Sequence, residues 1–362
     1  MARMSIRDEV RAVPAYRFQA RPHRVKLDQN EAPEDLDPGL KARALERLAA
    51  VDWHRYPELH AQGVARRIAE RDGWDPDGVI VAPGSNVLIQ AAILAAGLGR
   101  AVVTVSPTFA VYGAQARLLG ARLREVPLRP ADFELDVPGL TAALAAGPGV
   151  LFLADPAAPT GNRLDDEGVA EVLAAAEAHD WTVVLDEAYW PYDGRHRLDA
   201  VRGRPDRLAL RTFSKSDGLA GGRLGYALTH PDTAREIEKV LLPFRLSVLQ
   251  AVVAELVLDD PDVRAAGERR VAQTRRERER VRDELGRLPG VHVHPSATNF
   301  LLFRVPDADA VFHGMLERGV LVRRQDHLPG LDGCLRVTIG APAENDAFLE
   351  AARAALNAEV SR

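Results

Sequence analysis

Short apolar runs alternate with helix-like segments between residues 78 and 230, and this alternation limits the possible fold more than any other feature. The runs cover residues 78–82, 101–105, 149–154, 181–185 and 208–210. Such runs read as buried strands. The pattern predicts an α/β fold with a mostly parallel sheet and helices on both of its faces. A chain of 362 residues exceeds one ordinary core, so we expect a second, smaller lobe.

The last of these runs leads into the segment that carries the chemistry. Thr212 to Ser214 lie where the strand gives way to a loop, and α/β proteins bind ligands at this end of their strands. Lys215 follows, flanked by hydroxyl groups, in a chain that has only four lysines. Arg223 comes eight residues later, through a glycine-rich stretch too flexible for a helix interior. A lysine beside phosphate-binding groups indicates Schiff-base chemistry, although a lone lysine in a loop can also be a surface residue.

Three motifs in this segment resemble a known family. They are Ser214-Lys215, Gly218-Leu-Ala-Gly221 and Arg223-Leu-Gly225-Tyr226. Together they look like the cofactor-lysine segment of fold type I pyridoxal-phosphate (PLP) aminotransferases, nearest to the histidinol-phosphate aminotransferase family. The resemblance covers nearly the whole chain. It implies the PLP-transferase fold type I, with an N-terminal arm (1–45) joining the small domain, a large PLP-binding domain (46–260), and a linking helix with a C-terminal α+β small domain (261–362).

The resemblance implies that Lys215 holds PLP as a Schiff base and, once freed, moves a proton at the substrate's α carbon. A further set of residues would hold the cofactor phosphate. Ser85 can cap the helix that begins after the strand 78–82, while the exposed N–H groups face an anion. Any strand-turn-helix can look this way. By resemblance, the cofactor-binding set includes Ser85, Asn86, Thr212, Ser214 and Arg223.

Tyr56, in the trio Arg55-Tyr56-Pro57, resembles a family tyrosine that reaches the cofactor phosphate of the neighbouring subunit. The resemblance therefore implies a homodimer. Without it, Tyr56 would be an aromatic residue buried before a turn.

The cofactor ring has its own expected partners. Asp186 ends the strand 181–185, and a buried acid there is costly unless it is paired. A pyridinium nitrogen is its natural partner, because the carboxylate keeps the ring protonated and able to accept electrons. By resemblance, Tyr112 stacks on the ring and Tyr189 contacts its phenolic oxygen. Tyr112 could instead be an ordinary core residue.

Ala158 is the main departure from the family. Related enzymes have an asparagine before the Pro159-Thr160-Gly161 turn, which donates a hydrogen bond to the phenolic oxygen, and alanine cannot. One lost neutral hydrogen bond is worth roughly 0.5–1.5 kcal/mol, about tenfold in rate at most. Tyr189 would then carry that contact alone. Val87, Asp217 and Gly222 also depart from the family pattern, so the resemblance implies a divergent member of that family.

Arginines and the N-terminal arm are expected to bind the substrate. Arg323 and Arg336 match family arginines that hold its anionic end, and a planar guanidinium suits carboxylate or phosphate. Tyr16 and Asn30 match residues at the substrate mouth. Histidinol phosphate, with 2-oxoglutarate as amino acceptor, is the leading substrate by resemblance. Aromatic amino acids, decarboxylation of a phosphorylated amino acid, and a catalytically drifted PLP-fold binding protein remain alternatives.

Composition limits the partners and the compartment. A net charge of −5 gives no general attraction to nucleic acid, and the arginine-rich stretch 261–288 mixes both signs, as in a solvated helix. The one cysteine, Cys334, allows no internal disulfide and fits a reducing compartment. Charges occupy the first ten residues and no window holds eighteen apolar residues. We therefore expect a cytoplasmic protein without nucleic-acid, membrane or metal partners.

Overall fold

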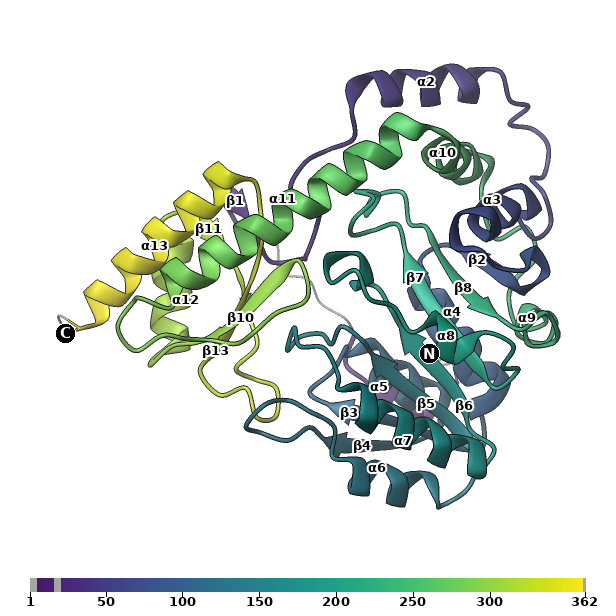
Figure 1. Ribbon diagram of the computed structural model, residues 1–362, viewed down its shortest axis with the longest axis horizontal. Helices are drawn as coiled ribbons and strands as arrows, with labels where there is room; N and C mark the ends of the chain where they lie inside the picture. The colour runs from purple at the N-terminus through teal and green to yellow at the C-terminus, as the bar shows by residue number, and fades with distance from the viewer. Residues whose placement is uncertain (1–4, 16–20, 361–362) are drawn as a thin grey trace.

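A seven-stranded sheet forms the centre of the larger lobe (Figure 1) in the computed structural model, which describes residues 5–15 and 21–360. The strand order is β2-β8-β7-β6-β5-β3-β4. All neighbouring strands are parallel except β8, which is antiparallel to β2 and β7. The strands are β2 (Val79–Ala82), β3 (Ala101–Ser106), β4 (Arg122–Pro127), β5 (Gly149–Ala154), β6 (Thr182–Asp186), β7 (Arg207–Thr212) and β8 (Gly225–Thr229). The predicted, mostly parallel sheet is confirmed.

Both faces of this sheet are buried, which explains the continuously apolar runs. Neighbouring residues of one strand, such as Val102 and Val103 of β3, belong to different core clusters on opposite faces. One face packs against α4 (Ser85–Ala92), α5 (Val111–Leu119) and α9 (Pro231–Glu238). The other packs against α3 (Gln62–Asp72), α6 (Val137–Leu144), α7 (Asp166–Ala178), α8 (Leu198–Val201) and α10 (Val248–Asp259). Shorter helical turns are η1 (Pro76–Gly78), η2 (Ile93–Gly97) and η3 (Trp190–Tyr192).

The smaller lobe has its own sheet and core. Its antiparallel sheet has the order β12-β13-β10-β9, and a short parallel pair joins β1 to β11. The elements are β1 (Val25–Lys26), β9 (His292–Val293), β10 (Phe300–Arg304), α12 (Ala308–Glu317), β11 (Val320–Leu321), β12 (Arg323–Arg324), β13 (Cys334–Thr338) and α13 (Pro342–Val360).

The N-terminal arm contacts both lobes. Its β1 strand pairs with β11 of the smaller lobe, as the resemblance implies. Its first helix, α1 (Asp8–Ala12), instead lies against α5 of the larger lobe, where Arg7 Nη2 donates a hydrogen bond to the Leu118 carbonyl at 2.7 Å. Helix α2 (Pro38–Ala49) then begins after Asp37, whose carboxylate caps it. The domain boundaries at residues 45 and 260 stay predictions.

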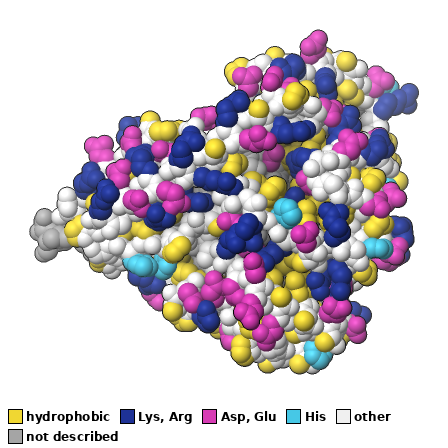
Figure 2. Space-filling model, viewed as in Figure 1, with side chains coloured by type: hydrophobic (Ala, Val, Ile, Leu, Met, Phe, Trp, Pro, Cys, Tyr) yellow, Lys and Arg dark blue, Asp and Glu magenta, His cyan; other side chains and the backbone are white. Residues whose placement is uncertain are grey.

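The charged stretch after residue 260 forms one long helix, α11 (Pro261–Leu285), which runs from α10 to the smaller lobe (Figure 1). Arg280 pairs with Glu277 and Glu284 along the helix, so oppositely charged side chains of the helix form ion pairs. Basic and acidic side chains are interspersed over the face seen in Figure 2. None of the helices within residues 5–15 and 21–360 is both long enough and apolar enough to cross a membrane.

Candidate active site

Lys215 lies in the loop after β7, at the carboxyl end of the parallel strands, as predicted. Its Nζ donates a hydrogen bond to the carbonyl of Gln29 at 3.0 Å and lies 5.7 Å from the centre of the Tyr189 ring. Burial lowers the pKa of the Lys215 amine, and the nearby charges of Arg336 and Arg223 lower it further. A larger fraction of the amine is therefore neutral and nucleophilic than for an exposed lysine.

Asp186 ends β6, the strand next to β7, and is buried. Its carboxylate accepts hydrogen bonds from the Tyr112 hydroxyl at 2.7 Å and from the Ala188 backbone N–H at 3.0 Å. Burial raises the pKa of this carboxyl, and the two hydrogen bonds only partly offset the effect. A cationic partner would stabilise the carboxylate more than these neutral donors do.

Tyr112 is fully buried in α5. Its ring stacks on that of Phe152, with centroids 4.9 Å apart and planes at 11°. In this arrangement Tyr112 is a core residue that reaches Asp186 through its hydroxyl. Its predicted stacking on a cofactor ring stays a prediction.

The predicted phosphate site is a cradle between two chain segments. Helix α4 begins at Ser85, and the residue before it is Gly84. The prediction that Ser85 caps the helix is wrong: Gly84 occupies the cap position, and no side chain there accepts from the first turn. The Val87 N–H donates to the Gly84 carbonyl at 3.2 Å, whereas the N–H groups of Ser85 and Asn86 are left for another acceptor, as in anion sites at helix N-termini.

Two glycines allow the segments to approach. A Cβ on Gly225 would lie 2.4 Å from the Ser85 backbone nitrogen, and a Cβ on Gly84 would lie 2.7 Å from Nη2 of Arg223. Arg223 Nη1 donates to the Ser214 hydroxyl at 3.3 Å. The cradle thus combines a helix N-terminus, a hydroxyl and a guanidinium group, which is a donor set for a phosphate.

Two other predicted phosphate ligands are placed differently. The Thr212 hydroxyl donates to the Leu224 carbonyl at 3.2 Å and accepts from the Ser214 backbone N–H, so its proton is used within the turn. The Asn86 side chain is exposed. Contacts of either residue with a phosphate stay predictions.

Tyr189 lies beside Ala158, the residue that replaces the family asparagine. Ala158 packs with Tyr189, Tyr192 and Phe300 in a small apolar cluster. The Tyr189 hydroxyl accepts a hydrogen bond from Asn30 Nδ2 at 2.8 Å. Asn30 was predicted at the substrate mouth, but the structure places its side chain in the core against Tyr189.

The two arginines predicted to bind the substrate lie opposite each other on two neighbouring strands. Arg323 of β12 and Arg336 of β13 are directly opposite in the antiparallel register. Arg336 Nη2 donates to the Asp28 carbonyl at 2.9 Å, and its guanidinium lies 5.2 Å from the centre of the Phe300 ring. Two like charges in this position repel, and an anion between them would remove the repulsion.

Tyr56 lies on the surface, with 83% of its side chain exposed, so the buried alternative is wrong. Its ring stacks on Phe244 at 4.7 Å. Two further exposed apolar residues adjoin this pair. The Leu59 carbonyl accepts from the Phe244 N–H at 3.2 Å, and Leu242 precedes Phe244 by two residues, so Tyr56, Leu59, Leu242 and Phe244 form an apolar surface. Tyr16, predicted to contact the substrate, lies outside the described residues.

A buried network of charges beneath the site was not found from the sequence. Arg211 of β7 pairs with Glu187 at 2.8 Å and with Asp72 at 3.2 Å. Tyr226 donates to Asp72 at 2.7 Å, and Arg71 donates to the Tyr226 hydroxyl. The network joins α3, the segment after Asp186 and the strands that flank the Lys215 loop, so it fixes these elements relative to one another. In the sequence, the one signal of this network is the charged Arg211 directly after the apolar run 208–210.

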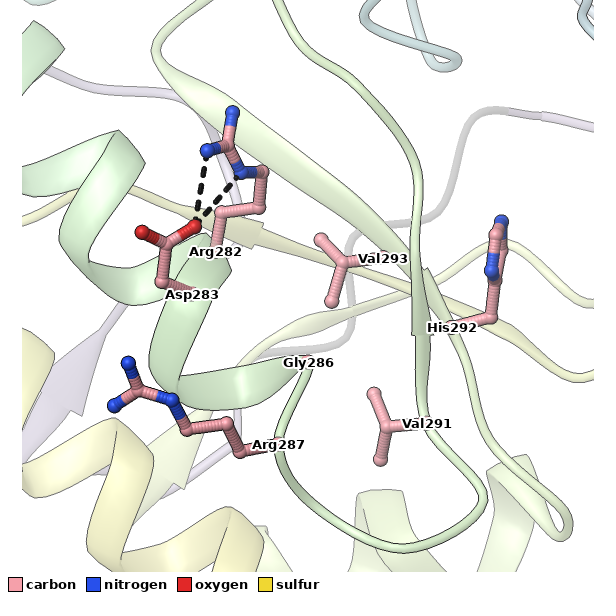
Figure 3. A pocket seen from close by; sticks show the side chains of 7 residues that line it. All are labelled: Arg282, Asp283, Gly286, Arg287, Val291, His292 and Val293. Carbon is pink, nitrogen blue, oxygen red and sulfur yellow. Dashed lines mark hydrogen bonds and ion pairs between the residues drawn. The ribbon is translucent and has the colours of Figure 1, made fainter.

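A hollow at the far end of α11 is separate from these residues (Figure 3). Arg282, Asp283, Gly286, Arg287, Val291, His292 and Val293 line it. His292, which lines the hollow, and His294 are near neighbours, with ring centroids 4.7 Å apart. Of the predicted site residues that the structure describes, none lines this hollow.

One edge of the large sheet therefore brings together a nucleophilic lysine, a buried acid and a phosphate cradle. This donor set fits PLP: Lys215 would hold its aldehyde carbon, Asp186 its ring nitrogen, and Ser85, Ser214 and Arg223 its phosphate. The fold and the site define a PLP-dependent enzyme of fold type I.

Comparisons with known proteins agree. The family described as aminotransferase class I and II matches residues 22–352. Histidinol-phosphate aminotransferase from Deinococcus radiodurans is 45% identical over 347 residues, which cover 96% of this chain and 95% of that protein. The chain belongs to the class I and II aminotransferases, within the histidinol-phosphate aminotransferase family.

Solved structures of this family share the fold. Histidinol-phosphate aminotransferase from Sinorhizobium meliloti, solved in complex with pyridoxal-5'-phosphate, has a TM-score of 0.81 at 27% identity and covers 94% of this chain and 92% of its own. The enzyme from Clostridium acetobutylicum has a TM-score of 0.84 at 20% identity, covering 92% and 99%. The protein is a PLP-dependent aminotransferase.

Proposed function

We propose that this aminotransferase moves the amino group of histidinol phosphate to 2-oxoglutarate. The opposed pair Arg323 and Arg336 carries this proposal, because it supplies two cations for an anionic substrate end close to Lys215. The name of the Deinococcus radiodurans relative supports the same amino donor.

Different residues of the chain have different roles in this reaction. PLP, when bound, draws electrons from the substrate's α carbon. Lys215, neutral in part because its pKa is lowered, takes the proton from that carbon and would deliver it to the cofactor carbon that bore the aldehyde, so that the amino group can leave the substrate. Asp186 holds a proton on the ring nitrogen. Tyr189 donates to the phenolic oxygen, and the arginines orient the anionic end of the substrate.

The active protein is proposed to be a homodimer in the cytoplasm. The apolar surface around Tyr56 and Phe244 supports the dimer, because Leu242 and Tyr56 expose 80% and 83% of their side chains there. Large exposed apolar patches mark interaction sites. In the dimer, Tyr56 would reach the phosphate cradle of the other subunit.

The experiment is a comparison of amino donors with purified protein, PLP and 2-oxoglutarate. Histidinol phosphate, phenylalanine and phosphothreonine are assayed for glutamate formation, and phosphothreonine also for carbon dioxide release. The Lys215→Ala variant is the control and should be inactive with every donor. Glutamate formed fastest with histidinol phosphate supports the proposal, whereas an inert histidinol phosphate overturns it. Carbon dioxide from phosphothreonine would instead assign a decarboxylase, and inertness with all donors would favour the drifted binding protein.

A further inference from the structure

Asn30 belongs to the N-terminal arm, yet its side chain is buried beside Tyr189, 159 positions away. Its backbone has φ = 55°, in the left-handed region that asparagine tolerates better than most residues. The Asn299 side chain donates to the Asn30 carbonyl at 3.1 Å. The position of Asn30 is therefore fixed by contacts on several sides.

The hydrogen bonds also decide which way the Asn30 amide points. The Thr338 hydroxyl accepts from the Asn30 backbone N–H at 2.9 Å, and so uses its own proton toward Asn30 Oδ1 at 3.3 Å. The amide oxygen therefore faces Thr338, and the NH₂ group faces Tyr189. A primary amide nitrogen can only donate.

This orientation sets the role of the Tyr189 hydroxyl. A phenol has one proton and can also accept. Because Asn30 donates to its oxygen, the phenol cannot give its proton to Asn30, and that proton is left for an acceptor in the site. Ala158, which packs in the same cluster as Tyr189, is apolar and its side chain offers no donor to such an acceptor.

We propose that Asn30 is a positioning residue that keeps Tyr189 a hydrogen-bond donor toward the phenolic oxygen of the cofactor, and does not itself bind the substrate. Asn30 then acts through Tyr189, which is the donor that remains where Ala158 replaces the family asparagine. The inference rests on the proposed aminotransferase chemistry, in which that oxygen is the acceptor.

The Asn30→Asp variant is the sharpest test, because it nearly keeps the shape and replaces the donor by a carboxylate that accepts. Tyr189 would then donate to the carboxylate and be lost to the cofactor. The Asn30→Gly variant tolerates the same φ and removes the amide without reversing its polarity. Both are compared with Tyr189→Phe and with the double variant Asn30→Asp/Tyr189→Phe.

The readouts are the dissociation constant of PLP and the pH midpoint of the change in its near-visible absorption when bound. A donor to the phenolic oxygen stabilises the deprotonated form, so its loss raises the midpoint. We expect Asn30→Asp to raise it by about one pH unit, close to the effect of Tyr189→Phe, and Asn30→Gly to raise it less. In the Tyr189→Phe background, Asn30→Asp should cause no further shift.

Other outcomes separate this inference from the proposed function. Asn30→Asp could instead raise the KM for the amino donor equally with and without the Tyr189 hydroxyl and leave the pH midpoint unchanged. Asn30 would then bind substrate. This result overturns the inference and leaves the proposed aminotransferase function intact. If the unaltered protein gives no absorption band with PLP, both the proposed function and the inference fail. Circular dichroism and a melting curve of the PLP-free protein identify a variant that fails to fold. If Asn30→Asp fails to fold, the pH midpoint of Asn30→Gly is the test, and an unchanged midpoint in that variant overturns the inference.

Discussion

Arg323 and Arg336 are directly opposite residues of the antiparallel strands β12 and β13. A sheet gains nothing from two guanidinium groups in this position, and like charges directly opposite are destabilising. The pair is understandable as a binding site for an anion, whose negative charge would offset the repulsion between the two guanidinium groups. Arg336 also lowers the pKa of the Lys215 amine, so this strand pair bears on both binding and reactivity.

Arg323→Gln should raise the KM for a phosphate-bearing donor by about 10–100-fold, since a hydrogen bond to a charged group is worth about 1.5–3 kcal/mol. Steady-state kinetics with histidinol phosphate measure the change. Arg324→Gln is the matched control, because Arg324 is the next residue of β12 but pairs with Asp326 and Asp309. Equal KM values for the two variants would contradict an anion site at Arg323.

Leu242→Glu should convert a dimer into a monomer, because it places a charge in the apolar surface that carries Tyr56. Light scattering measures the mass. PLP affinity should fall together with dimerisation if Tyr56 completes the other subunit's cradle. Leu98→Glu is the control, since Leu98 is also exposed but follows η2. A Leu242→Glu protein of unchanged mass would remove the support for this surface as the interface.

Ala158→Asn restores the family residue and should nevertheless destabilise the protein. Its side chain would enter the apolar cluster of Tyr189, Tyr192 and Phe300, and overpacking of this kind costs about 1–3 kcal/mol. The hydrogen bond gained with PLP is worth only about 0.5–1.5 kcal/mol. Urea unfolding of the PLP-free protein measures the loss, with Ala158→Ser as a smaller change. Unaltered stability together with tighter PLP binding would show that space for the asparagine has been kept.

His294 should make the protein sensitive to mild acid. Burial lowers the pKa of its ring to about 4, and the ring packs against Phe133 with centroids 4.9 Å apart. The unfolded chain binds a proton near pH 6.5 and the folded one only near pH 4, so the free energy of unfolding falls as pH decreases through this window. His294→Phe should lose this part of the pH dependence, as urea unfolding at several pH values would reveal. His179→Phe, at an exposed position, should keep it; identical slopes for the two variants would refute the assignment to His294.

The large sheet and the place of the central chemistry follow from the amino-acid sequence. A strand that is buried on both faces appears in the sequence as a short continuous apolar run, so it can be recognised locally. In a parallel sheet, the residues that follow the strands all lie at the same edge. Asp186 and Lys215 follow neighbouring strands β6 and β7 for this reason. The glycines at 84 and 225 were visible as well, although the cap assigned to Ser85 was wrong because Gly84 takes that position.

The contacts between distant segments depend on packing and could not be predicted from the sequence. The hydrogen bond from Asn30 to Tyr189, the pairing of Arg211 with Asp72 and Glu187, and the reach of Tyr112 to Asp186 leave no local pattern. The opposition of Arg323 and Arg336 depends on strand register, and a shift by one residue would turn one of them to the other face. Local propensity fixes which residues form a strand or helix, but packing and register fix which side chains meet.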